Sequence, residues 1–159
     1  MKRRIQQGSQ SGMTLLELII TCTILLVISS MALPIARYRV MRMREQQLKQ
    51  ALLDMRTAID NYKQLVDDHK IKVEVGSTGY PPDLETLVKG VPLASTANGG
   101  SSIRFLRSIP MDPMTHSTDW GLRSVEDDPD STTWGGKNVY DVYSKSNGMG
   151  TDGRRYSDW

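Results

Sequence analysis

A predominantly apolar run stands near the start of the chain, from Met13 to Leu33, and Glu17 is its only charged residue. A helix over this run would be about 30 Å long at about 1.5 Å per residue, which is enough to cross the core of a bilayer. The alternative is a buried core helix, but the remaining chain is too short to surround a helix that is apolar on every side. The pattern therefore predicts a membrane-spanning segment at residues 13–34.

Beyond this run, apolar residues recur every three or four positions, which is the spacing of one face of an α-helix. They are Leu48, Leu52, Met55, Ile59, Tyr62 and Val66. Pro34 lies between the two patterns, where a proline either ends a helix or kinks it. Because the helical pattern resumes, we expect a kink in one helix from about residue 13 to 68, with residues 35–75 as its amphipathic continuation.

Turn signals and short elements fill the second half of the chain. GSTGYPP at residues 76–82 predicts the break after the long helix, and a short helix follows, with Asp83 at its N-terminus and Gly90 after its end. Residues 94–102 read as a flexible loop. Two strand candidates and a polar surface loop between them come next, at residues 120–125, 138–144 and 126–137.

Composition excludes several classes of function. The formal net charge is only +2 and no basic-aromatic motif is present, so we expect no nucleic acid as partner. Cys22 is the only cysteine, which excludes an intramolecular disulfide. His69 and His116 lack the spacing of a metal motif and are expected at the surface. Because no catalytic set or phosphate loop stands out, the sequence predicts that the chain is not an enzyme.

The residues before the apolar run resemble a processing signal. Three basic residues precede Gly12, as in a secretory signal peptide, but here cleavage after the glycine would keep the apolar segment. GMTLLE, at residues 12–17, resembles the class III signal of type IV pilins and type II secretion pseudopilins. The resemblance implies that a prepilin peptidase removes the leader, residues 1–12, by cutting between Gly12 and Met13, and that Met13 becomes N-methylated. Met13 stands where the family usually has phenylalanine.

Glu17 needs a partner or a function inside a membrane. A charged carboxylate there costs about 2.5–3.5 kcal/mol at the bilayer centre and less near an interface. The resemblance places Glu17 at the fifth position of the mature chain, where the family carries its glutamate. We expect it to set the register of a filament by pairing with the Met13 amine of a neighbouring subunit. The alternative is a tolerated charge at the interface.

Four arginines follow the apolar run and leave its orientation open by charge counting. They are Arg37, Arg39, Arg42 and Arg44. They outnumber the charges of the leader, although positive residues favour the cytoplasmic side. The resemblance decides for a cytoplasmic N-terminus, because the peptidase site is cytoplasmic in the family. The arginines would contact either lipid headgroups or acidic residues of neighbouring subunits.

The rest of the chain resembles the G-type major pseudopilin of type II secretion, through YPPDLETL, RSIPMDPM and NVYDVYSKSNG. The resemblance implies an α+β fold, with a long N-terminal helix on a small antiparallel sheet that is periplasmic and spans residues 76–159. It implies a homo-oligomeric filament subunit anchored in the inner membrane, with other pseudopilins and an assembly platform as partners. A type IV pilus subunit is the alternative, although such pilins commonly close a C-terminal loop with two cysteines. A membrane-anchored enzyme or binding module would leave Gly12 and Glu17 without a purpose.

The glycine-rich C-terminal loop often binds calcium in G-type subunits. By this resemblance Asn147, Asp152 and Asp158 are the candidate ligands, since calcium prefers carboxylate and carbonyl oxygens. The alternative is a turn held by hydrogen bonds and by packing of Tyr156 and Trp159.

Overall fold

One helix, α1, runs from Leu15 to Asp67 and accounts for both apolar patterns of the sequence. The computed structural model of the chain describes residues 14–94 and 102–159, without the side chains of residues 31–35. The helix continues through Pro34, so the proline does not end it. This confirms the predicted single helix, whereas the expected kink stays a prediction. The chain divides into two units between Met41 and Arg42.

The amphipathic face of α1 supplies much of the core of the second unit. Leu48, Met55 and Ile59 are completely buried, and Leu52 and Tyr62 are nearly so. Val66 is partly buried against the same core, so the predicted face is confirmed. Full burial of one such side chain stabilises a fold by about 1.5–3 kcal/mol, which makes this face the main support of the unit.

Helix α2, Leu84–Lys89, has the capping residues that the sequence predicts. Asp83 accepts a hydrogen bond from the Thr86 amide at 2.6 Å, which satisfies one of the free amides of the first turn. Gly90 follows the last turn at φ 85°, where a side chain would be strained. Leu84 and Leu87 are buried, so the helix packs through its apolar side.

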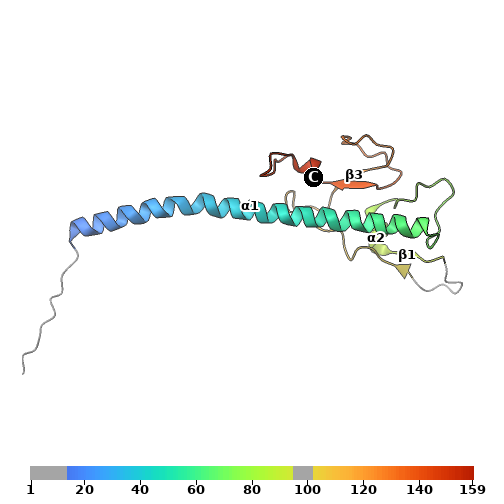
Figure 1. The fold of residues 1–159 in the computed structure, drawn as a ribbon, viewed down its shortest axis with the longest axis horizontal. Helices are drawn as coiled ribbons and strands as arrows, with labels where there is room; N and C mark the ends of the chain where they lie inside the picture. The colour runs from blue at the N-terminus through green and yellow to red at the C-terminus, as the bar shows by residue number, and fades with distance from the viewer. Residues whose placement is uncertain (1–13, 95–101) are drawn as a thin grey trace, which may run out of the picture. The chain divides into compact units, whose positions relative to one another are not determined.

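Two small antiparallel sheets complete the α+β fold (Figure 1). Strands β3, Gly121–Arg123, and β4, Asp141–Tyr143, pair with each other inside the two predicted strand ranges. Strands β1, Val91–Pro92, and β2, Ser102–Ile103, were not predicted, because two-residue strands are too short to show alternation. The expected loop at residues 94–102 is therefore wrong at Ser102, and residues 95–101 lie outside the described chain.

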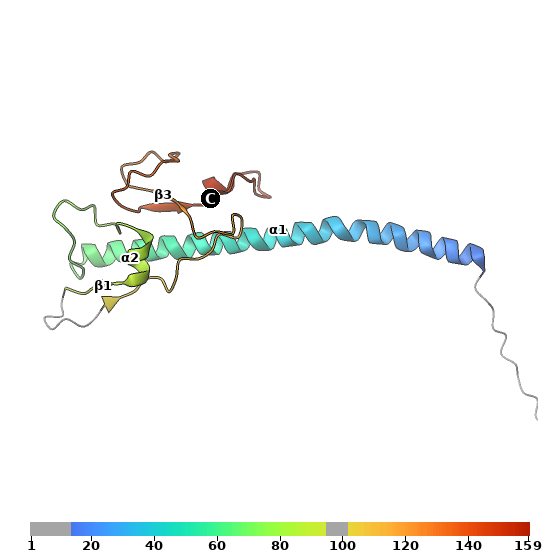
Figure 2. The ribbon, with the colours of Figure 1, turned by 180° about the vertical axis from the view of Figure 1, so that it is seen from behind.

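The second half of α1 lies between these elements. Figures 1 and 2 show β3 and the end of the chain on one side of it and β1 on the other. The last element is the 3₁₀-helix η1, Tyr156–Asp158. The residues that join α1 in the core come from α2, from β4 and the residues just before β3 and β4, and from η1; they include Leu87, Trp120, Val139, Val142 and Tyr156.

Candidate functional site

Thr14 closes the start of helix α1. Its hydroxyl oxygen accepts a hydrogen bond from the Glu17 amide at 3.3 Å, and its carbonyl accepts from the Leu18 amide at 3.1 Å. Thr14 and Glu17 therefore have the spacing of a capping box. Glu17 lies in the first turn, where the helix dipole favours a negative charge. This local role of Glu17 was not predicted from the sequence, although the T-x-x-E spacing signals it.

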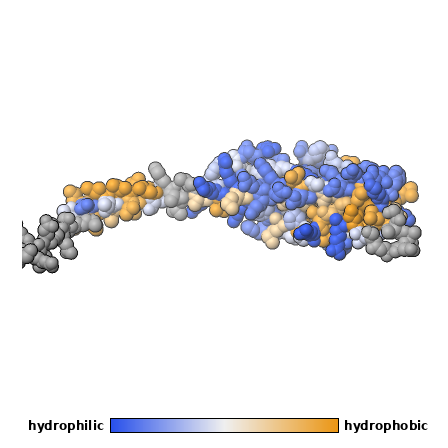
Figure 3. Space-filling view, turned by 60° about the horizontal axis from the view of Figure 1, so that its bottom comes forward, coloured by the Kyte–Doolittle hydropathy of each residue, from blue (hydrophilic) through white to orange (hydrophobic). Residues whose placement is uncertain are grey.

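The first half of α1 leaves its apolar side chains uncovered. Every residue from 14 to 30 is exposed, including Leu15 at 78% and Leu26 at 70%. Figure 3 shows hydrophobic side chains along the visible face of this stretch. The hydroxyls of Thr21, Thr23 and Ser30 donate to carbonyls of their own helix. A contiguous apolar surface of this kind marks a site of interaction with another apolar surface.

Among residues 14–94 and 102–159, no helix is both long and apolar enough to cross a membrane. The described chain thus does not confirm the span expected at residues 13–34. The leader and the expected cleavage site between Gly12 and Met13 lie outside the described residues, as does the side chain of Pro34.

The three candidate calcium ligands do not form a cluster, and two of them accept hydrogen bonds from neighbouring residues. Asp152 accepts hydrogen bonds from Arg154, through Nε at 3.0 Å, Nη2 at 2.9 Å and the amide at 3.1 Å. The hydrogen bond from the Arg154 amide is the main cause of the lowered pKa of the Asp152 carboxyl. Asn147 is exposed, and Asp158 accepts from the Ser157 hydroxyl at 3.0 Å. Within the described ranges, no three Asp, Glu, His or Cys side chains are grouped to hold a metal ion.

Glu45 links helix α1 to the C-terminal loop. It is only 6% exposed, and both of its oxygens accept from Thr151, through the amide at 2.7 Å and the hydroxyl at 2.6 Å. The Tyr156 hydroxyl donates to the same carboxylate at 3.3 Å. Burial, followed by the charge of Glu45, raises the pKa of Tyr156. A buried carboxylate with three such donors anchors the loop firmly.

Glu45 and two cationic residues form a charged stripe along one side of α1. Lys49 and Arg56 lie four and eleven residues after Glu45, which places all three on one side of a helix with 3.6 residues per turn. The Lys49 ammonium is 4.3 Å from the centre of the Trp159 ring. Arg56 donates to the Trp159 carbonyl and to Asp141, both at 2.7 Å. The end of the chain is therefore bound along α1 by charged side chains.

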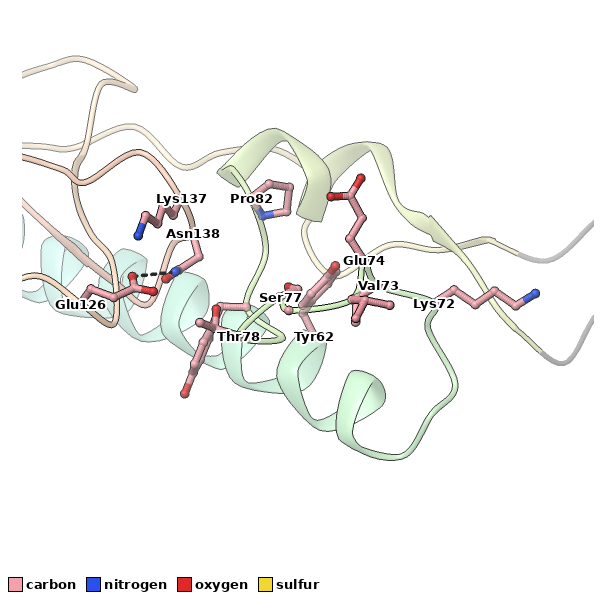
Figure 4. Close-up of a pocket in the computed structure, with 13 residues that line it drawn as sticks. Tyr62, Lys72, Val73, Glu74, Ser77, Thr78, Pro82, Glu126, Lys137 and Asn138 are labelled. Carbon is pink, nitrogen blue, oxygen red and sulfur yellow. Dashed lines mark hydrogen bonds between the residues drawn. The ribbon is translucent and has the colours of Figure 1, made fainter.

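A hollow of about 540 Å³ lies between residues 72–82 and 126–138 (Figure 4). Two lysines and two glutamates line it, so its lining favours neither an anion nor a cation. Glu126 is bound by the Asn138 amide at 3.1 Å. Figure 4 shows Lys72 pointing away from this pair. Burial raises the pKa of Tyr62, whose ring lines the hollow.

Comparison with known families bears on the N-terminal part of the chain. A family model for the prokaryotic N-terminal methylation motif matches residues 7–33. The chain carries this motif. The match supports the pilin-like class, whose members are structural proteins, and it implies a membrane anchor, processing by a prepilin peptidase and assembly into a filament. No curated protein and no solved structure matches the chain significantly.

The methylation motif ends at Leu33, and sequence reasoning missed several residues beyond it. Glu45 precedes Leu48 by three positions, so a carboxylate on the buried face of α1 was a signal that could have been read. Asp112 is 1% exposed and accepts from the Met114 amide at 2.7 Å and the Ser144 hydroxyl at 2.5 Å. Its contact with Ser144 joins two distant segments, and no local pattern predicts it.

Proposed function

We propose that this chain is a structural subunit of a type II secretion pseudopilus and has no enzymatic activity of its own. The observation that carries the proposal is the uncovered apolar half of α1, which lies within the methylation motif and contains one carboxylate, Glu17. In a filament, equivalent helices from other copies would cover this surface. In the inner membrane before assembly, lipid would cover it, with the N-terminus cytoplasmic and the second unit periplasmic.

Glu17 would set the axial register of the filament. Processing after Gly12 gives Met13 a free amino group, which remains protonatable after one methylation. In one straight helix the two groups lie about 6 Å apart along the axis, so the partner of Glu17 is better supplied by the next subunit. The low dielectric between packed apolar helices strengthens such a pair.

Substitution of Glu17 tests this role. Glu17→Ala and Glu17→Gln remove the charge, and we expect both to abolish filament assembly, whereas Glu17→Asp keeps the charge and should retain part of it. Thr21→Val is the matched control, since the Thr21 hydroxyl is bonded to the Leu18 carbonyl of its own helix at 2.9 Å. Assembly is measured by co-purification of subunits. Normal assembly of all three Glu17 variants would contradict the role.

The choice of a secretion filament over a type IV pilus rests on the second unit. Asp112 of RSIPMDPM is bonded to Ser144 of NVYDVYS, so two segments that carry the G-type resemblance meet in one buried contact. A deletion strain separates the functions. Secreted proteins trapped in the periplasm would support the pseudopilus, whereas loss of long surface fibres with normal secretion would support the pilus.

Processing can be tested directly on the membrane form of the protein. We expect mass spectrometry to find a mature chain that begins with N-methylated Met13. Gly12→Val should block cleavage, because a larger side chain would stand at the bond that the peptidase cuts. A chain that keeps residues 1–12, or one that loses the whole apolar segment, would overturn the proposed function.

A further inference from the structure

We propose that the C-terminal loop, residues 147–158, is closed by charged groups of the chain itself and needs no calcium ion. The proposal concerns the second unit alone, so it stands independently of filament assembly. It reverses what the G-type resemblance implies for this loop. Three features of the structure carry it: the state of the carboxylates, the state of the loop carbonyls and the position of Glu45.

Asp152 already has a cation. The Arg154 guanidinium binds one of its oxygens through two nitrogens, and the Arg154 amide binds the other. Calcium takes six to eight oxygen ligands at about 2.3–2.6 Å. To bind Asp152, it would therefore have to displace the Arg154 guanidinium from that carboxylate. The positive charge of Lys49 also acts on Asp152. These two cations therefore offset the negative charge of Asp152 that would attract a divalent cation.

The backbone of the loop uses its own carbonyls. The Gly148 carbonyl accepts from the Tyr156 amide at 3.2 Å, and the Gly150 carbonyl accepts from the Gly153 amide at 3.0 Å. The Arg154 carbonyl accepts from the Gly150 amide at 2.8 Å. These bonds turn the carbonyls toward amides within the loop, whereas a calcium loop turns several of them toward one centre.

Glu45, and not a metal ion, fixes the loop to helix α1. Its carboxylate faces hydrogen-bond donors, namely the amide and hydroxyl of Thr151 and the hydroxyl of Tyr156. The ring of Tyr156 packs edge-on against Trp159 with centroids 5.1 Å apart, which covers the anchor. An anionic anchor on the helix and an arginine in the turn thus replace a metal between carboxylates.

Thermal unfolding of the full chain in detergent micelles tests the need for metal. Any ligand that binds only the folded state raises the melting temperature with its concentration. Near-UV circular dichroism measures the unfolding, and we expect the same melting temperature in EDTA and in calcium chloride. A saturable rise with calcium that Asp152→Asn abolishes would overturn the proposal.

Substitution of Glu45 tests the anchor. Glu45→Gln replaces one accepting oxygen by a donor that faces Thr151, so we expect the melting temperature to fall by several degrees, equally in EDTA and in calcium. Glu85→Gln is the matched control, because Glu85 forms an exposed ion pair with Lys89 and should have almost no effect. Should Glu45→Gln fail to fold, Thr151→Val removes a single donor and is expected to give a smaller fall. The anchor would be contradicted if calcium restored the melting temperature of either variant, or if both variants melted at the wild-type temperature.

Discussion

The two halves of helix α1 have the same backbone structure and opposite relations to the rest of the chain. From residue 14 to 30 every side chain is exposed, whereas Leu48, Met55 and Ile59 are completely buried. Hydrogen bonds differ in the same way. Thr23 in the first half donates to carbonyls of its own helix, whereas Glu45 and Arg56 in the second half bind residues more than 80 positions away.

The second half of α1 therefore contributes to the stability of the folded chain, whereas the first half leaves its side chains exposed. The second half of α1 is stabilised by contacts that form when the chain folds. In the first half, the hydroxyls of Thr21, Thr23 and Ser30 bond to carbonyls of their own helix, so its apolar surface and the Glu17 carboxylate remain for other contacts. Substitutions in the two halves should therefore be detected by different measurements.

The largest contrast is expected for truncation of a leucine in each half. Leu52→Ala empties a position that is 2% exposed and should lower the free energy of unfolding by about 2–5 kcal/mol. Leu25→Ala, at a position that is 63% exposed, should leave the unfolding of the second unit unchanged. Denaturant titration in micelles measures both. A similar loss for the two variants would show that the first half contributes to the fold after all.

Hydroxyls and carboxylates give the second contrast. Asp112→Ala leaves the buried Ser144 hydroxyl and the Met114 amide without their acceptor, which should cost about 1–3 kcal/mol of stability. Thr23→Val removes a hydroxyl that is bonded only within its own helix, and we expect no change in the same denaturant titration. The Ser144→Ala variant should lose less than Asp112→Ala, because it keeps the bond to Met114.

Periodicity predicted the parts of this contrast that depend on local pattern. The continuity of α1, its buried face and the capping of α2 by Asp83 follow from spacing and from residue type, and the structure confirms them, although α1 ends at Asp67 and not at residue 75. Strands β1 and β2 were missed, because each has two residues and forms only where the chain happens to return beside itself. Their pairing depends on tertiary contacts, which a single sequence does not display.

The candidate site was predictable in its N-terminal half only. Gly12, Met13 and Glu17 stand in a short linear motif, so their order along the chain carries the information. The charged stripe of α1 is different, because Glu45 and Thr151 are 106 residues apart. The bond between Asp152 and Arg154 joins near neighbours, but the sequence could not show it, because the direction of both side chains depends on how the loop folds.

Gly121 offers a third test, confined to the folded unit. It pairs with Tyr143 across β3 and β4, and a Cβ atom at this position would lie 2.2 Å from Tyr143 Cζ. Gly121→Ala should therefore destabilise the unit by about 1–3 kcal/mol through overpacking. The double variant with Tyr143→Leu should recover part of this loss, because the ring is absent. Additive effects in a double-mutant cycle would mean that the two residues do not touch.

The smallest expected effect belongs to a carboxylate in the second unit that, like the hydroxyls of the first half, is bonded locally. One oxygen of Asp127 accepts from the amides of Ser124 at 2.8 Å and Gly135 at 3.1 Å. These bonds lower the pKa of Asp127 in the folded state. A depressed folded pKa gives stability that is present above the unfolded pKa and is lost as the pH falls through the folded pKa.

Acidification should therefore release the loop that Asp127 organises before it unfolds the core. We expect the protection of the Ser124 and Gly135 amides from hydrogen exchange, corrected for intrinsic rates, to fall as the pH drops below the ordinary range of an aspartate. Asp127→Asn should lack this protection at every pH, because a neutral amide oxygen is a weaker acceptor. Asp130→Asn, an exposed carboxylate of the same loop, is the control and should keep the wild-type profile. If the core amides of Val142 lost protection in the same pH range, the loop and the core would form one cooperative unit, and the contrast between local and long-range bonds would not extend to this part of the molecule.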